Sequence, residues 1–275
     1  MKRVELDNLS IAYDDEGDGI PILCIHGYPL NRQIWRPQWD GLANSFRVIA
    51  PDLRSHGDSF VRGSSNLREA IHTVDLMAND LALLLDAIGV SQPVVVNGLS
   101  MGGYVAFAFL RNYPSRVRAL ILTATRARPD SDVEKDNRRN AIQLAQTQGV
   151  APVVDGMLRR LVSPETLSGK PGLVERIREI MLSSSVEGII GDLKGMIDRP
   201  DARPMLAGIR VPVLILVGND DQIIPLDEAQ AMKDSISESS LETIKDAGHL
   251  LNMEQPETYN RTVRNFVQSL ARGQE

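Results

Sequence analysis

The chain contains one cysteine, Cys24, and four histidines among its 275 residues. A single cysteine excludes an internal disulfide and any metal or iron–sulfur site built from several cysteines, so we expect no metal. Cys24 lies in the apolar run 22–25, which predicts a small buried side chain rather than a reactive thiol. No apolar run approaches the roughly 20 residues that span a bilayer, and the first seven residues lack the apolar segment of a signal peptide. We therefore expect a cytoplasmic protein with no membrane partner.

Basic residues are also in the minority. The chain has 30 Lys and Arg against 36 Asp and Glu, which gives a formal net charge of -6. Binding to a phosphate backbone needs clustered basic residues, so nucleic acid is not an expected partner. Hydrophobic residues make up 43% of the chain, an ordinary value for a globular protein. The length suits one large α/β domain with an inserted subdomain, and a homo-oligomer is compatible with it.

The order of apolar and amphipathic segments predicts an α/β fold. Near-continuous apolar runs are typical of parallel strands that are covered on both faces. Between them, apolar residues recur at helical spacing, as expected of crossover helices. An antiparallel edge strand or hairpin is expected over 5–13. The predicted buried strands are 21–25, 46–50, 93–96, 117–122 and 212–217, and the predicted helices are 34–42, 74–88 and 101–112.

This alternation stops between about 126 and 206. No buried strand is predicted there, and apolar residues recur at helical spacing. Prolines divide the segment, because a proline is tolerated only in the first turn of a helix, and we expect three or four helices. The sequence therefore predicts a mostly parallel, twisted sheet flanked by helices, formed by residues 1–125 and 207–275, with a helical cap subdomain over 126–206.

The segment Gly98-Leu99-Ser100-Met101-Gly102 stands between a predicted strand and a predicted helix. A serine on such a sharp turn projects its hydroxyl above the sheet, where it can attack a carbonyl carbon. The flanking glycines match the steric demand of the turn. Ser100 is therefore the candidate nucleophile.

A serine hydroxyl needs a base and an acid that orients the base. His249 lies in a glycine-bearing loop after the last strand-like run, 240–244, and is the best candidate base. Asp220 and Asp221 follow the strand 212–217, and one of them should face His249. The chain order serine, aspartate, histidine is the one expected when the nucleophile turn lies early in a parallel sheet.

Two backbone N–H groups are expected to stabilise the negative charge on the tetrahedral intermediate. Met101 follows Ser100 at the start of a helix and supplies one of them. The second is expected in the turn after 21–25, where Tyr28 is the better donor because Pro29 has no N–H. His26 is predicted to fix this turn through its ring nitrogens.

The other two histidines have structural interpretations. His56 is expected to anchor the loop 52–59 near the pocket, and His72 is expected to be solvated at the start of an amphipathic helix.

Several motifs resemble those of the α/β-hydrolase superfamily, in its cap-bearing esterase and 3-oxoadipate enol-lactonase-like branch, over essentially the whole chain. The resemblance assigns the acid to Asp221 and the base to His249. In the loop 51–59, Ser55 stands where the family pattern P-D-x-R-G-x-G-x-S has glycine. The matching segments are His26-Gly27, 51–59, 98–103 in the pattern G-x-S-x-G-G, 218–225 in the pattern G-x-x-D-x-x-x-P, and 248–257.

The resemblance implies an enzyme that transfers acyl groups. Similar dehalogenases and epoxide hydrolases have aspartate at the position of Ser100, and dienelactone hydrolases have cysteine. A serine there implies a carboxylesterase that acts on a small-molecule ester or lactone and water, with no cofactor. The alternatives are an enol-lactonase or other lactonase and a perhydrolase-like aryl esterase, followed by a hydroxynitrile lyase or a ligand receptor without hydrolytic activity.

The predicted cap should close over the serine and favour small or short-acyl esters. Met157, Leu161 and Met181 are candidates for the wall of the acyl pocket, since methionine adapts to irregular surfaces. A lactonase with an acidic substrate would need a cationic group there. Arg126 and Arg128, just after a strand, are the candidates for that group, although solvated arginines are the simpler interpretation.

Overall fold

The computed structural model describes residues 1–63 and 71–272, and its central sheet has the order β1-β2-β4-β3-β6-β7-β8-β9, with β5 paired to β2. Strands β3 to β9 in this order pair in parallel, whereas β2 is antiparallel to β1, β4 and β5. The strands are β1 (Lys2–Glu5), β2 (Leu9–Glu16), β3 (Pro21–Ile25), β4 (Arg47–Pro51), β5 (Phe60–Val61), β6 (Val94–Leu99), β7 (Val117–Thr123), β8 (Val213–Gly218) and β9 (Ser239–Ile244).

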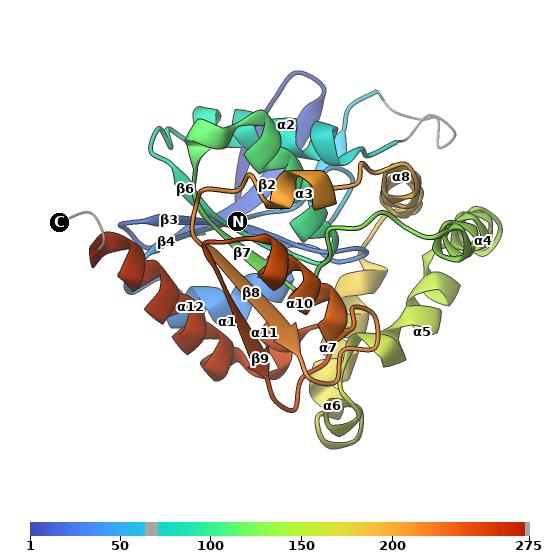
Figure 1. Ribbon diagram of the computed structural model, residues 1–275. Helices are drawn as coiled ribbons and strands as arrows, with labels where there is room; N and C mark the ends of the chain where they lie inside the picture. Colours follow the sequence, from blue (N-terminus) through green and yellow to red (C-terminus); the bar gives the residue numbers. More distant parts are fainter. Residues whose placement is uncertain (64–70, 273–275) are drawn as a thin grey trace.

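Helices cover both faces of this sheet (Figure 1). One face packs against α2 (Val74–Ala87), α3 (Met101–Asn112) and α10 (Leu226–Ser235). The other packs against α1 (Arg36–Leu42) and α12 (Pro256–Arg272). Because β3, β6, β7 and β8 are buried along their length, they are almost wholly apolar in sequence. Short helices η1 (Arg32–Trp35), η2 (Pro114–Arg116) and α11 (Leu251–Glu254) complete the connections.

Six helices lie between β7 and β8, more than the three or four expected from the prolines. Prolines stand in the first turns of α6, α7 and α9, so each of them begins a helix, and Gly149, with a φ of 80°, separates α4 from α5. We call this segment the helical insertion; it gathers on the right of Figure 1. Its helices are α4 (Asp132–Gln148), α5 (Val150–Leu161), α6 (Pro164–Gly169), α7 (Pro171–Leu182), α8 (Val186–Ile197) and α9 (Arg203–Leu206).

The other expected elements are present with small shifts at their ends. The predicted strand 93–96 extends to Leu99, and the predicted strand 46–50 is shifted by one residue. The segment 5–13 falls across the antiparallel pair β1 and β2. The segment 34–42 is split between η1 and α1. These differences concern the ends of the expected elements, whereas the short strand β5 was not expected from the sequence.

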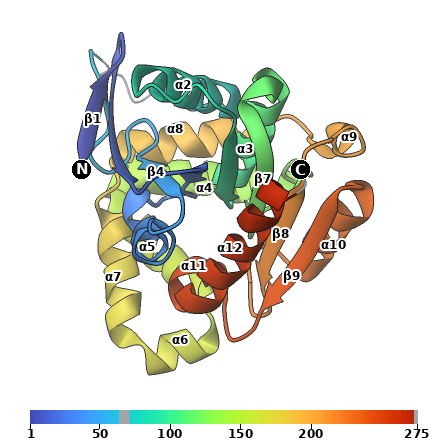
Figure 2. The same cartoon turned by 90° about the vertical axis from the view of Figure 1, so that its left-hand side faces the viewer.

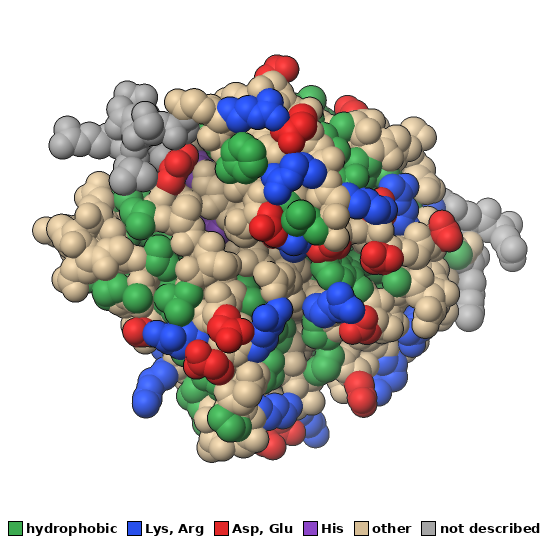
Figure 3. All heavy atoms as spheres, turned by 180° about the vertical axis from the view of Figure 1, so that it is seen from behind, with side chains coloured by type: hydrophobic (Ala, Val, Ile, Leu, Met, Phe, Trp, Pro, Cys, Tyr) green, Lys and Arg blue, Asp and Glu red, His purple; other side chains and the backbone are tan. Residues whose placement is uncertain are grey.

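The surface mixes charges of both signs with apolar side chains on the face that Figure 3 shows. Cys24 is fully buried, and burial raises the pKa of its thiol. Within residues 1–63 and 71–272, the structure has no helix that is both long and apolar enough to cross a bilayer.

Candidate active site

Ser100 occupies the turn between β6 and α3 with a φ of 56° and a ψ of -114°, a left-handed conformation that a non-glycine residue rarely adopts. Its N–H donates to the carbonyl of Thr123 on β7 (2.9 Å), and its own carbonyl accepts from the Thr125 hydroxyl (2.7 Å). Both bonds tie the strained residue to the neighbouring strand and the loop that follows it. Such strain persists only where the surrounding structure overdetermines it.

Glycine is required on the strand side of this turn. A Cβ added to Gly98 would lie 2.3 Å from the carbonyl oxygen of Gly102, and the backbone cannot easily yield. The same reasoning places the turn after β3 directly beside Ser100, because a Cβ on Gly27 would lie 3.0 Å from the Cβ of Ser100. The segments around Ser100 and Tyr28, far apart in sequence, are therefore neighbours.

His26 holds the turn after β3 as the sequence predicts. The Leu53 N–H donates to Nε2 of His26 (2.9 Å), so Nδ1 is the protonated nitrogen and donates to the Gly27 carbonyl (2.9 Å). Full burial, together with the positive charge of the nearby His56, lowers the pKa of His26 to about 3. His26 is therefore neutral and joins the turn at Gly27 to the loop at Leu53.

Asp221 and His249 form a hydrogen-bonded pair at the carboxyl ends of β8 and β9. His249 Nδ1 lies 2.8 Å from Asp221 Oδ2, and both side chains are buried. The other carboxylate oxygen of Asp221 accepts the backbone N–H groups of Ile223 (2.8 Å) and Ile224 (3.0 Å). With its acceptor oxygens occupied in this way, the carboxylate fixes the histidine with Nδ1–H toward it and leaves Nε2 for proton transfer.

The two halves of the site meet at one edge of the sheet. Ser100 follows β6, Asp221 follows β8 and His249 follows β9, and parallel strands have their carboxyl ends on the same side. In the described residues, no hydrogen bond joins the Ser100 hydroxyl to His249. Asp220, the other sequence candidate, donates its backbone N–H to the carbonyl of Ala247 (3.0 Å), so it helps to join the two loops.

Glu254, within the matching segment 248–257, is buried, and the sequence predicts no role for it. One carboxylate oxygen accepts the N–H of Gly248 (2.8 Å), next to His249, and the other accepts the N–H of Ser163 in the helical insertion (2.7 Å). Glu254 thus links the histidine loop to the helical insertion. The sequence shows an acidic residue here but neither its burial nor its partners, which lie 6 and 91 positions away.

A cavity of about 430 Å³ lies against α4 and α5 of the helical insertion, and its lining includes none of Ser100, Asp221 and His249. Two lining residues adjoin the site: Tyr28 follows Gly27, and the N–H of Ile223 donates to Asp221. Met157, a candidate for the wall of the acyl pocket, lines the cavity. Leu161 and Met181 do not; both are packed in the apolar core, because the faces of α5 and α7 that carry them turn toward each other and the sheet. The remaining cavity wall comes mainly from α4 and α5.

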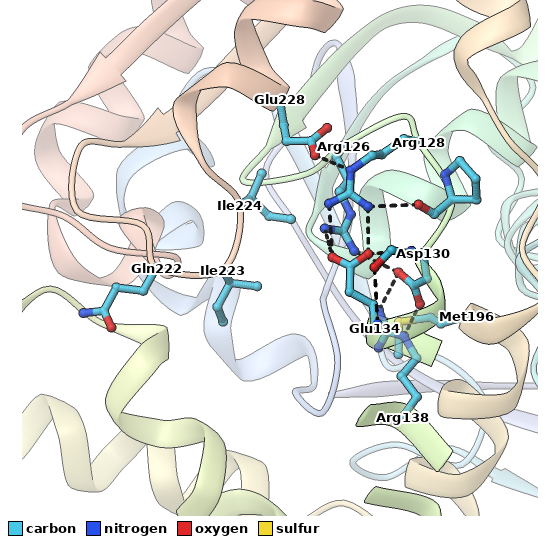
Figure 4. A network of polar contacts seen from close by, with 12 residues as sticks. Arg126, Arg128, Asp130, Glu134, Arg138, Met196, Gln222, Ile223, Ile224 and Glu228 are labelled. Carbon is cyan, nitrogen blue, oxygen red and sulfur yellow. Dashed lines mark hydrogen bonds and ion pairs between the residues drawn. The ribbon is translucent and has the colours of Figure 1, made fainter. Parts of the chain in front are cut away.

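Arginines dominate the charged part of the cavity wall. Arg126, Arg138 and Arg160 line it, together with one carboxylate, Glu134. Figure 4 shows Arg126 and Arg128 directed at Glu134 of α4, at Asp130 in the loop before it, and at Glu228 of α10. In this network four guanidinium groups face three carboxylates, namely Arg126, Arg128, Arg138 and Arg199 with Asp130, Glu134 and Glu228.

Both candidate arginines are therefore held in ion pairs, but the Arg128 side chain remains 31% exposed. Arg126 is buried and binds Asp130 (2.8 Å) and Glu134 (2.6 Å) through its terminal nitrogens. Its Nε is buried without a partner in the described residues, as is the hydroxyl of Tyr28. Burial would raise the pKa of Glu134, but the hydrogen bonds and charges of Arg126 and Arg128 hold it well below its usual range.

His56 is buried as an anchor of its loop, but the expectation that His72 is solvated is wrong. His72 is 2% exposed, and its Nδ1 lies 2.9 Å from Oδ1 of Asp192 on α8. The sequence pattern placed His72 correctly before a helix. It did not show that α8, about 120 positions later, covers this helix start.

The chain belongs to the alpha/beta hydrolase fold family, whose model matches residues 20–256. It is 39% identical in sequence to a thermophilic esterase from Thermogutta terrifontis, solved with malate bound, with a TM-score of 0.93 over 98% of this chain and 99% of that one. It is 26% identical to 3-oxoadipate enol-lactonase 2 of Acinetobacter baylyi over 93% of this chain and 91% of that protein. It is 27% identical to a non-heme chloroperoxidase of Streptomyces lividans over 96% and 98%. The protein is thus a hydrolase of this family.

Proposed function

We propose that the protein is a serine carboxylesterase that cleaves small or short-acyl esters through an acyl-enzyme on Ser100. The observation that supports this most is the Asp221–His249 hydrogen bond, at the same sheet edge as the strained Ser100 turn. The 39% identity to an esterase over almost the full length points in the same direction. Helices of the insertion border a cavity of about 430 Å³, which suits a small acyl group.

In this proposal Oγ of Ser100 attacks the ester carbonyl carbon while Nε2 of His249 accepts the hydroxyl proton. Asp221 keeps the imidazole oriented and stabilises its positive charge. The tetrahedral intermediate then releases the alcohol, which takes the proton from His249. Water gives a proton to His249 as it attacks the acyl-enzyme, and Ser100 regains that proton as the acid leaves. The hydrogen bond between Ser100 and His249 is expected to form with bound substrate, as is common for catalytic contacts.

The negative oxygen of the intermediate needs preorganised donors. We assign them to the backbone N–H groups of Met101, at the start of α3, and Tyr28, in the turn that approaches Ser100 at Gly27. Removing one such donor in an enzyme of this type costs about 10²- to 10³-fold in kcat.

The test is the hydrolysis of p-nitrophenyl esters from acetate to decanoate by the wild type and by Ser100→Ala. We expect turnover to be fastest with the short acyl groups and to be lost in the variant, with both proteins equally folded by circular dichroism. Fastest cleavage of decanoate would contradict the short-acyl assignment. Turnover that survives Ser100→Ala would contradict the nucleophile. Release of cyanide from a cyanohydrin, or ligand binding with no turnover, would favour a lyase or a receptor instead.

A second candidate function, hydrolysis of a lactone or ester that bears a carboxylate, is favoured by the arginines in the cavity wall. Arg126, Arg138 and Arg160 face a single lining carboxylate, and an acidic substrate would complement this excess charge. One relative is a 3-oxoadipate enol-lactonase. The matched probes are the p-nitrophenyl monoester of succinate and neutral p-nitrophenyl butyrate. A preference for succinate that Arg138→Gln reduces would support this candidate, and a preference for butyrate would exclude it.

A further inference from the structure

Asp192 on α8 lies at the centre of a polar cluster that the proposed reaction does not use. Its carboxylate is fully buried, with Oδ1 2.9 Å from Nδ1 of His72 and Oδ2 3.0 Å from Nε2 of His56. The contact with His56 is an ion pair without the alignment of a hydrogen bond. A buried carboxylate needs such partners, because an unpaired charge in the interior is strongly unfavourable.

The partners of His56 define its charge. Nδ1 lies 3.0 Å from the carbonyl of Arg54, and Nε2 faces Asp192, so both ring nitrogens face acceptor oxygens. Only the protonated imidazole presents a hydrogen from both nitrogens. Burial opposes this charge, but the carboxylate of Asp192 outweighs burial and raises the pKa of His56. Burial would likewise raise the pKa of Asp192, and its histidine partners lower it to about 2.

This cluster reaches the turn beside Ser100 through His26. The rings of His56 and His26 are in contact, with centroids 5.2 Å apart. His26 in turn binds the N–H of Leu53 and the carbonyl of Gly27. The loop at 53–56 and the turn at 26–28 are therefore held by two adjacent histidines, one neutral and one charged, and the charged one pairs with Asp192 of the helical insertion.

A run of three serines before α8 makes further contacts with the same segments. The Ser184 hydroxyl donates to the carbonyl of Pro29 (3.0 Å), and the Ser185 hydroxyl donates to the carbonyl of Ser55 (2.9 Å). The Ser183 hydroxyl accepts from the Asn31 side chain (2.8 Å). Ser55, which stands where the family pattern has glycine, keeps a φ of 62°, so its carbonyl remains directed at this contact.

The backbone of α8 also packs tightly here, as Figure 2 shows for α8 beside α2. The N–H of His72 donates to the carbonyl of Gly191 (2.9 Å). A Cβ on Gly191 would lie 2.5 Å from the His72 ring, and a Cβ on Gly195 would lie 1.8 Å from the His72 carbonyl oxygen. Residues 183–195 thus form a close polar contact, which we call the α8 seam, with the loops that hold the turn beside Ser100.

We propose that Asp192 is a positioning residue, which acts from the helical insertion through His56 and His26 to hold the turn at Gly27 and Tyr28 in place beside Ser100. This inference rests on the proposed function. Asp192 touches neither the nucleophile nor the Asp221–His249 pair. Its effect is therefore on the placement of the Tyr28 N–H relative to the reacting carbonyl, and misplacement by about 1 Å costs up to about 100-fold in rate.

The test compares Asp192→Asn, His56→Gln and the double variant with p-nitrophenyl acetate, below the melting temperature of each. We expect kcat to fall about 10- to 100-fold in Asp192→Asn with KM changed less than about twofold, as expected when an interaction specific to the transition state is weakened. If Asp192 acts through His56, the second substitution should add little to the first. Ser184→Ala, which leaves no buried charge unpaired, should lower kcat in the same direction and covers the case in which Asp192→Asn does not fold.

The control is Val267→Ala on α12, a fully buried residue remote from the seam, which should lower stability without lowering kcat. If Asp192→Asn and Ser184→Ala fold and keep the wild-type kcat while Ser100→Ala is inactive, the positioning role is wrong and the proposed function stands. Independent, additive losses in the double-variant cycle would also overturn the route through His56. If Ser100→Ala itself remains active, the proposed function fails first.

Discussion

Among the residues that the structure describes, two buried aspartate–histidine groups have similar distances and different consequences. Asp221 and His249 lie on loops after β8 and β9, with a single hydrogen bond of 2.8 Å between them. Asp192 lies on α8 of the helical insertion and is shared by His56 and His72. In the first group the aspartate is saturated by backbone N–H groups and the histidine keeps Nε2 available. In the second, His56 has both ring nitrogens engaged.

The comparison shows that composition and distance do not distinguish a group suited to proton transfer from one suited to holding loops together. A histidine whose two nitrogens both face oxygens is favoured in its charged form, which makes it a poor acceptor of a further proton. A histidine held by one nitrogen can change its charge during a reaction. The number of nitrogens with partners is therefore the informative feature.

The largest expected effect is a loss of kcat when the charge of Asp221 is removed. Asp221→Asn should lower kcat by about 10⁴-fold with little change in KM, because the amide favours the wrong tautomer of His249. The measurement is steady-state hydrolysis of p-nitrophenyl acetate, with Asp220→Asn as the control. The same change in Asp192 should cost far less in kcat and more in melting temperature. Equal losses of kcat in the two variants would remove the distinction between the groups.

The next largest effect is on stability, and it comes from adding a methyl group at a crowded glycine near Ser100 or at one beside His72. Gly98→Ala and Gly191→Ala should each destabilise the fold by about 3 kcal/mol, since the added carbon meets the Gly102 carbonyl in one case and the His72 ring in the other. Gly156 on α5 has no atom within 4 Å of such a carbon, so Gly156→Ala should gain about 0.5 to 1 kcal/mol. Urea unfolding measures all three. If Gly191→Ala left the free energy of unfolding unchanged, the close approach of α8 to His72 would not be needed for stability.

The smallest effect is the pH dependence of the second group. The raised pKa of His56 means that its contribution to stability is fully present below the ordinary value of about 6.5 and is lost as the pH rises through the raised value. The groups around His56 are Asp192, Asp52, His26 and the carbonyl of Arg54. Since burial makes His26 harder to protonate, its own contribution falls as the pH drops below about 6.5.

The contributions of His56 and His26 are separated by comparing the melting temperature of the wild type with that of His56→Gln at pH values below and above about 6.5. The excess stability of the wild type over the variant should be largest at the acidic side and should shrink as the pH rises. An excess that grows with pH would show that His56 is neutral in the fold, contrary to the two contacts of its ring.

Much of the fold and of the candidate site follows from local sequence. The strands β3, β6, β7 and β8 could be predicted from apolar runs because strands buried on both faces contain few polar residues. The Ser100 turn could also be predicted, because backbone crowding at position 98 leaves glycine as the only acceptable residue type. His249 and the pair Asp220 and Asp221 could be named because they lie on loops that follow strands, and the resemblance to the α/β-hydrolase superfamily then selected Asp221.

Only the tertiary structure decided which polar residues outside those turns are buried, and with which partners. Asp192 with His56 and His72, Glu254 with Gly248, and the arginines around Asp130 join segments that are distant in sequence. A charged side chain in a helix looks the same in sequence whether it faces water or a partner, because its partner is set by helix packing rather than by neighbouring residues. The sequence alone determined the sheet and the residues at its edge, and the packing of the helical insertion determined what surrounds them.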